Sequence, residues 1–236
     1  MNRELIIAID GPSGAGKSTL SKLLAKALNY INIDTGAMYR SVALAAQRRG
    51  IEPSDEEALR RLCDTISIDF VRSGSGERVL LNGEDVSEAI RTPEISLLTS
   101  RVSACKGVRE AMVRLQRKMG ERGGVVLEGR DIGSVVFPGA EVKFFLQASA
   151  GERGRRRYEE LKGKGFPVDL EQTVAEVEER DAADSAREHA PLIRAEDAEV
   201  IDSTTLSIDQ VLTEMLQVVR ARRRAAGLPE IPLKGG

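Results

Sequence analysis

A glycine-rich segment between an apolar run and a helical pattern constrains this 236-residue chain more than any other feature. Residues 11–18 read Gly-Pro-Ser-Gly-Ala-Gly-Lys-Ser and match the pattern G-x-x-x-x-G-K-[ST]. The β-branched run Leu5–Ile9 before it predicts a buried strand, and apolar residues recur at helical spacing over Lys17–Leu28. This order predicts a phosphate-binding loop between a strand and a helix.

Phosphate binding explains the residue types in this loop. Glycines let successive backbone N–H groups point into one concavity, and the following helix adds the positive end of its dipole. Lys17 can reach the β- and γ-phosphates of a nucleoside triphosphate, and the Ser18 hydroxyl can bind Mg²⁺. We therefore expect the ATP-binding residues to be Gly11, Pro12, Ser13, Gly14, Ala15, Gly16, Lys17, Ser18 and Thr19.

Short apolar runs alternate with helical stretches along the rest of the chain. This alternation predicts an α/β fold with a mostly parallel sheet and helices on both faces. The pattern changes over about residues 51–123, where two predicted strands, Ile66–Arg72 and Arg78–Asn82, form a hairpin. A long, mostly helical stretch follows from Glu94 to Met119, and we interpret the whole region as an insertion into the α/β core.

Composition narrows the class of ligand. The 35 Lys and Arg residues, 26 of them Arg, are balanced by 37 Asp and Glu. A net charge of −2 argues against bulk affinity for nucleic acid, and 3% aromatic residues argue against base-stacking platforms. Two cysteines are too few for a zinc site, and no apolar run is long enough for a membrane span. We expect a cytoplasmic protein whose arginines bind phosphates or carboxylates at defined places.

Three segments carry arginines at informative positions. Arg40 lies one turn into the helix expected after the second strand, and Arg130 follows another core strand. The predicted helix over residues 150–164 carries Arg153, Arg156 and Arg157, and is either a solvated helix or a lid that closes over the transferring phosphoryl group. The phosphate-binding loop favours the lid. The arginines of the last helix, such as Arg220, Arg222, Arg223 and Arg224, are interpreted as a solvated face.

Four motifs together resemble the bacterial cytidylate kinase (CMP kinase) family: residues 10–18, 34–40 (Asp-Thr-Gly-Ala-Met-Tyr-Arg), 129–133 (Gly-Arg-Asp-Ile-Gly) and 202–205 (Asp-Ser-Thr-Thr). The match runs in order over about residues 4–220. It implies a P-loop NTPase-type, five-stranded parallel core, a monophosphate-binding insertion with a small antiparallel hairpin, and a short helical lid. We expect the core over about 1–50, 124–150 and 188–225, the insertion over 51–123, the lid over 151–187 and a loose tail over 226–236.

The resemblance also implies an activity and its residues. The expected reaction is phosphorylation of CMP and dCMP by ATP with Mg²⁺, in pyrimidine nucleotide metabolism, by a monomer that binds neither nucleic acid nor membranes. CMP-binding positions fall on Thr35, Arg40, Ser100, Arg109, Arg130, Asp131, Arg180, Asp184 and Arg187. Catalytic positions fall on Lys17, Arg130, Arg153, Arg156 and Arg157. The alternatives are another small-molecule kinase, for UMP, AMP or shikimate, and a P-loop switch or nucleic-acid-dependent ATPase.

Overall fold

The computed structural model of the chain describes residues 3–73, 76–186 and 192–230. They form two compact units, one from residues 1–32 and 122–236 and the other from residues 33–121. The strands are β1 (Ile6–Asp10), β2 (Ile31–Asp34), β3 (Ile68–Ser73), β4 (Gly76–Leu81), β5 (Glu84–Asp85), β6 (Val125–Gly129), β7 (Val142–Gln147) and β8 (Glu199–Asp202). The helices are α1 (Lys17–Leu28), α2 (Thr35–Arg48), α3 (Glu56–Thr65), α4 (Pro93–Val102), α5 (Lys106–Gly120), α6 (Ala150–Gly163), α7 (Leu170–Ser185) and α8 (Ile208–Ala225), with short helical turns at Ala89–Arg91 and Ile132–Val136.

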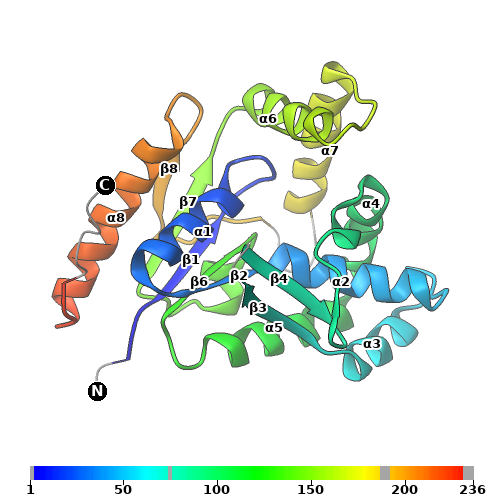
Figure 1. Cartoon of the computed structure of the whole chain (residues 1–236), viewed down its shortest axis with the longest axis horizontal. Coiled ribbons are helices and arrows are strands. Elements are labelled where there is room, and N and C mark those ends of the chain that lie inside the picture. The colour runs from blue at the N-terminus through cyan, green and yellow to red at the C-terminus, as the bar shows by residue number, and fades with distance from the viewer. Residues whose placement is uncertain (1–2, 74–75, 187–191, 231–236) are drawn as a thin grey trace. The chain divides into compact units, whose positions relative to one another are not determined.

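The main sheet has five strands in the order β2-β6-β1-β7-β8, with helices on both faces (Figure 1). Strand β1 pairs in parallel with β6 and β7, and β7 pairs in parallel with β8, so the predicted parallel α/β sheet is confirmed. In this register Asp10 lies beside Gly129, and Gln147 lies beside Asp202. The loops that follow these strands therefore leave from one edge of the sheet, where open α/β folds bind ligands.

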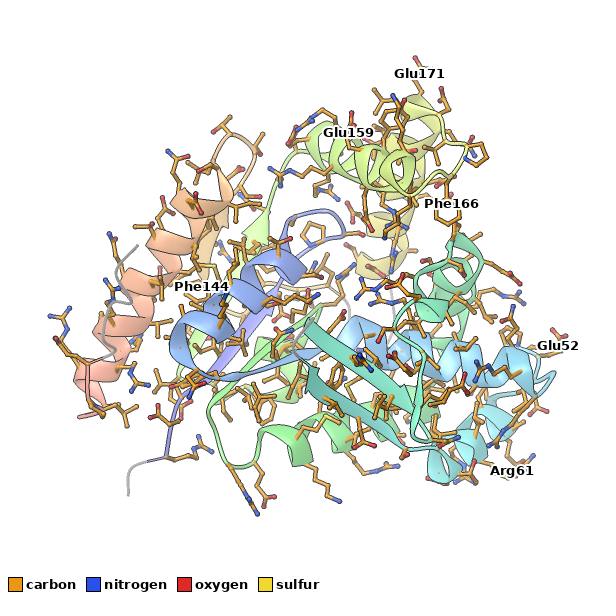
Figure 2. The ribbon with its side chains drawn as sticks, viewed as in Figure 1. Glu52, Arg61, Phe144, Glu159, Phe166 and Glu171 are labelled. Atoms are coloured by element: carbon orange, nitrogen blue, oxygen red, sulfur yellow. The ribbon has the colours of Figure 1, made fainter. Side chains whose placement is uncertain are left out.

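The core of the first unit lies between this sheet and two helices, α1 and α8, which pack on each other. Leu20 and Leu24 come from α1, Met215 and Val219 from α8, and Phe144 from β7, all nearly inaccessible to solvent. Figure 2 labels Phe144 inside this layer, whereas Glu159 and Glu171 of α6 and α7 are exposed. Burying a side chain the size of Leu or Phe contributes about 2 kcal/mol relative to leaving it in water. Strand β1, which leads into the glycine-rich loop, is packed against this core.

The second unit contains the predicted hairpin, formed by β3 and β4 in antiparallel register, and a short third strand, β5, that the sequence did not predict. The stretch predicted to be mostly helical consists of two helices, α4 and α5, separated at Ser103–Cys105. Helix α4 packs against α2, and α5 packs against α3. The two helices thus have different main packing partners.

The last helix departs from the expectation of a solvated arginine face at one residue. Arg223 is 6% exposed, and its guanidinium donates to the Tyr30 hydroxyl at 2.6 Å and to the carboxylate of Glu4. It also donates to the carbonyl of Pro229 at 3.1 Å. The neighbouring Arg222 and Arg224 are exposed as expected. Arg223 therefore joins the last turn of α8 to Glu4 and Tyr30 near the start of the chain. The run of charged residues around it in the sequence did not reveal this contact.

Candidate active site

The glycine-rich loop between β1 and α1 has backbone conformations that need glycine. Gly11 has a φ of 145° and Gly14 a φ of 77°. A Cβ at Gly11 would lie 2.0 Å from the carbonyl oxygen of Leu146, and one at Gly14 would lie 2.9 Å from that of Arg153. A side chain at either position would therefore collide with backbone. The loop ends where α1 begins at Lys17, so its N–H groups and the helix N-terminus together form the anion-binding arrangement that the motif predicts.

Lys17 is buried at the start of α1, and its Nζ donates to the carbonyl of Pro12 at 2.6 Å. Burial holds the pKa of Lys17 well below its usual range, and the positive charges of Arg130 and Arg180 lower that pKa further. Glu128 and Asp10 act in the opposite direction. Two cations and two carboxylates thus act on Lys17, and an anionic ligand bound at the loop would favour its charged form.

Ser18 and Glu128 place oxygen atoms beside the loop. The Ser18 hydroxyl donates to Glu128 Oε2 at 2.8 Å, and the Ser21 hydroxyl lies 3.4 Å from Glu128 Oε1. Glu128 is 3% exposed. A hydroxyl and a carboxylate next to a phosphate site fit Mg²⁺, which prefers oxygen ligands and takes the rest from phosphates and water. Sequence reasoning did not assign Glu128, although a carboxylate at the end of the strand beside β1 was a usable signal.

Arg130 and Asp131 follow strand β6, as predicted. Arg130 Nε donates to Asp184 Oδ2 at 2.8 Å, and the Asp184 side chain is 2% exposed, on α7. Asp131 is 5% exposed. Arg180 lies one turn before Asp184 on the same helix. The structure thus places four of the predicted acceptor-binding residues in the first unit, whereas Arg187 lies outside the described residues.

The three arginines predicted on the lid have partners within the first unit. Arg153 donates to the Ser13 carbonyl at 3.1 Å and forms an ion pair with Asp181 at 2.5 Å. Arg156 donates to the Ser203 hydroxyl at 3.1 Å. Arg157 pairs with Glu160 of its own helix at 2.9 Å. In this structure Arg153 joins α6 to the glycine-rich loop, and Arg156 joins it to the loop after β8; their catalytic role stays a prediction.

The remaining predicted acceptor residues belong to the second unit. Asp34 caps α2 by accepting from the N–H of Ala37 at 2.8 Å, and its other oxygen lies 3.0 Å from an Arg40 nitrogen. Arg109 of α5 is 6% exposed, with its guanidinium carbon 5.7 Å from the centre of the Tyr39 ring. The other two positions are Thr35, buried in the first turn of α2, and Ser100, half-buried on α4.

Comparison with known proteins identifies the family. The cytidylate kinase family model matches residues 7–221, which include the glycine-rich loop, the 129–133 segment and the whole second unit. The chain belongs to the cytidylate kinase family. A cytidylate kinase of Syntrophotalea carbinolica is 70% identical over 95% of each chain, and one of Bacillus subtilis is 49% identical over 95% of this chain and all of its own. Membership makes the chain a kinase, a transferase with a nucleotide-binding P-loop.

A solved structure agrees on the fold. An uncharacterized protein from Eubacterium ventriosum aligns with a TM-score of 0.51 at 12% identity, over 92% of this chain and 98% of its own. Across the described ranges no helix is long and apolar enough to cross a lipid bilayer.

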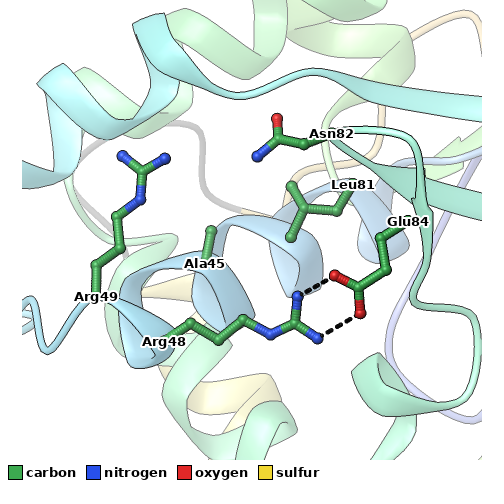
Figure 3. A pocket seen from close by; sticks show the side chains of 6 residues that line it. All are labelled: Ala45, Arg48, Arg49, Leu81, Asn82 and Glu84. Carbon is green, nitrogen blue, oxygen red and sulfur yellow. Dashed lines mark hydrogen bonds and ion pairs between the residues drawn. The ribbon is translucent and has the colours of Figure 1, made fainter.

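The second unit also contains a pocket away from the cytidylate kinase motifs (Figure 3). Arg48 at the end of α2 and Glu84 of β5 face each other there through two hydrogen bonds of 2.7 and 2.8 Å. The pocket is lined by Ala45, Arg48, Arg49, Leu81, Asn82 and Glu84. None of these is a predicted site residue, and the charged pair is satisfied internally. We interpret the pocket as a gap in the packing between α2 and the hairpin, with no assigned function.

Proposed function

We propose that this protein transfers the γ-phosphoryl group of ATP to CMP or dCMP, with Mg²⁺, and releases ADP and CDP or dCDP. The observation that carries the proposal is 70% identity over nearly the whole chain to a relative named cytidylate kinase. The backbone of the loop from Gly11 to Gly16 and the cations around Lys17 support the donor half of the reaction. The reaction belongs to pyrimidine nucleotide metabolism.

The chemistry of the acceptor sets what the protein must supply. The attacking atom is an oxygen of the CMP phosphate, which is largely ionised at neutral pH, so no general base is required. Catalysis then depends on alignment of the two phosphates and on stabilisation of the charge that spreads over the transferred group. This requirement agrees with the concentration of Lys and Arg, rather than His or Cys, at the predicted positions.

We assign the donor side to Lys17, the N–H groups of the loop and Ser18. Lys17 would leave the Pro12 carbonyl and contact the β- and γ-phosphates. Ser18, oriented by Glu128, would hold Mg²⁺, which when bound neutralises phosphate charge and orients the transferred group. Exclusion of water by the lid would limit hydrolysis of ATP.

On the acceptor side, arginines would hold the phosphate of CMP. Arg130 would exchange its contact with Asp184 for that phosphate, together with Arg40 and Arg187. Ser100, Arg109 and Asp131 would read the cytosine, and Arg180 and Asp184 would lie near the ribose. The lid residues Arg153, Arg156 and Arg157 would stabilise the group in transfer, once released from their present partners.

An acceptor panel tests this function. Purified protein, ATP and Mg²⁺ would be assayed for ADP release with CMP, dCMP, UMP, AMP and shikimate in turn, and for release without an acceptor. We expect CMP and dCMP to give the highest kcat/KM and the acceptor-free rate to be far lower. A higher rate with UMP, AMP or shikimate than with CMP would show that the protein phosphorylates that compound instead. Hydrolysis of ATP stimulated by nucleic acid, with no small acceptor, would overturn the proposal.

A further inference from the structure

Asp10 is the last residue of β1 and directly precedes the glycine-rich loop, yet its carboxylate points to a different segment. Its Oδ1 accepts from the N–H of Ile132 at 2.8 Å, and its Oδ2 accepts from the N–H of Gly133 at 2.7 Å. Asp10 is 4% exposed. A single carboxylate thus connects the start of the ATP-binding loop to the residues that follow Arg130 and Asp131.

The two N–H groups need this carboxylate because of where they lie. Ile132 and Gly133 begin a short helical turn, and the first N–H groups of a helix have no partner within it. The residue at the usual capping position, Asp131, makes no side-chain hydrogen bond to the turn. Asp10 therefore caps the turn from another strand, and the carboxylate accepts charge-assisted hydrogen bonds, which are stronger than neutral ones.

The packing around the contact leaves little room for adjustment. A Cβ at Gly133 would lie 3.3 Å from Asp10 Oδ2 and 3.1 Å from Cδ of Lys143. Strands β1 and β6 are in register, with Asp10 beside Gly129, so the peptide that carries Arg130 is held at both ends. It is hydrogen-bonded in the sheet on one side and capped by Asp10 on the other.

From this geometry we infer that Asp10 is a positioning residue for the acceptor site: its carboxylate holds the 129–133 segment so that Arg130 and Asp131 meet CMP at a fixed distance from the ATP-binding loop. The inference rests on the proposed function, since it names how two assigned residues are oriented. Asp10 touches neither reacting phosphate in this scheme. It acts through the backbone of Ile132 and Gly133.

The charge state of Asp10 agrees with such a role. The pKa of Asp10 is raised to about 6: burial is the largest cause and the charge of Asp131 acts in the same direction, while the two N–H groups and Lys17 oppose the shift. Keeping a carboxylate in a site that disfavours its charge costs stability. An asparagine has the same shape, but its amide accepts through only one oxygen and would turn its NH₂ group toward the second N–H.

The test is Asp10→Asn, with steady-state kinetics for both substrates and direct binding of CMP and of ATP by calorimetry. We expect the KM and Kd for CMP to rise about tenfold and the values for ATP to change by a smaller factor, because the 129–133 segment loses its cap whereas Asp10 acts on Lys17 only through its charge. Gly133→Ala crowds the same contact from the other side and should raise the KM for CMP as well. Combined, the two changes should be less than additive.

Glu141→Gln is the matched control. Glu141 Oε2 accepts from the N–H of Ile6 at 2.8 Å, so it is a carboxylate bound to backbone at the opposite end of the same strand. Its substitution should leave the ratio of the two KM values unchanged. Equal changes for CMP and ATP in Asp10→Asn, or CMP binding like that of the wild type, would overturn the inference. Absence of CMP phosphorylation in the wild type would instead overturn the proposed function.

Discussion

At the amino end of β1 the charged side chains bond to one another, whereas at its carboxyl end they lie around a loop of backbone N–H groups. Arg223, Glu4 and Tyr30 form one closed cluster at the amino end. At the carboxyl end, burial lowers the pKa of Lys17, on which Arg130 and Arg180 act in the same direction and Glu128 and Asp10 in the opposite one. The same residue types therefore form a closed structural cluster at one end of the strand, whereas at the other end they lie around a loop whose N–H groups can bind an anion.

The two ends differ in which groups are available to bind their polar side chains and N–H groups. The cluster at the amino end is completed by the protein itself, with the Pro229 carbonyl as the last acceptor of Arg223. The carboxyl end presents the N–H groups of the glycine-rich loop and the start of α1, an arrangement that can bind an anion. Substitutions at the carboxyl end should therefore affect activity first, and those at the amino end should affect stability first.

The largest effect is expected for Arg130→Ala. In the proposed function Arg130 holds the acceptor phosphate, so its loss should lower kcat/KM for CMP by about 10³-fold and leave the affinity for ATP nearly unchanged. Initial rates with CMP and calorimetric titration with ATP would measure the two. Arg155→Ala is the control, because Arg155 is exposed on α6 and forms an ion pair with Glu152 of its own helix. Near-normal turnover in Arg130→Ala would remove Arg130 from the site.

A smaller effect, on stability, is expected from the charge of Asp10. Its pKa of about 6 in the fold lies above the ordinary 3.8, so the folded state binds the proton more tightly than the unfolded chain. The stability this supplies is complete below about pH 4 and is lost as the pH rises through about 6. The free energy of unfolding of Asp10→Asn, relative to that of the wild type, should therefore rise by up to about 3 kcal/mol between pH 4 and pH 7. Urea unfolding at both pH values measures this, and a difference that does not change with pH contradicts it.

The smallest effect should come from the amino end. Arg223→Ala removes the hydrogen bonds to Tyr30 and Pro229 and the ion pair with Glu4, so we expect the free energy of unfolding to fall by about 2 kcal/mol. The kcat/KM for CMP at a temperature where the variant is folded should not change. Arg224→Ala, one residue along on the exposed face, should alter stability by less than about 0.5 kcal/mol. A loss of activity without a loss of stability would break the distinction between the two ends.

Much of the fold could be predicted from local pattern. The β-branched run before the glycine-rich loop is β1, and the two runs around residues 73–76 are the β3–β4 hairpin. The helix break at Ser103–Cys105 could not be predicted, because both flanking segments have ordinary helical sequences. Only the packing of α4 on α2 and of α5 on α3 separates them.

The candidate site divides in the same way. The glycine-rich motif identifies Lys17 and Ser18 because a phosphate-binding loop needs those residue types at a fixed spacing. Glu128 and Asp10 were not assigned, because their roles depend on contacts with Ser18 and with Ile132 and Gly133, more than a hundred residues away in the chain. The position of a carboxylate at the end of a strand indicates that it lies near the site, but not which groups it will contact.

By itself, then, the sequence determined the class of this protein: a parallel α/β kinase whose loop after β1 binds phosphate. It could do so because propensity and motif spacing are local properties. The tertiary structure alone decided which charges are buried and which partners they take, so that Arg223 closes a structural cluster and Asp10 caps a turn beside Arg130. Burial and ion pairing depend on segments brought together by the sheet, and no stretch of local sequence specifies them.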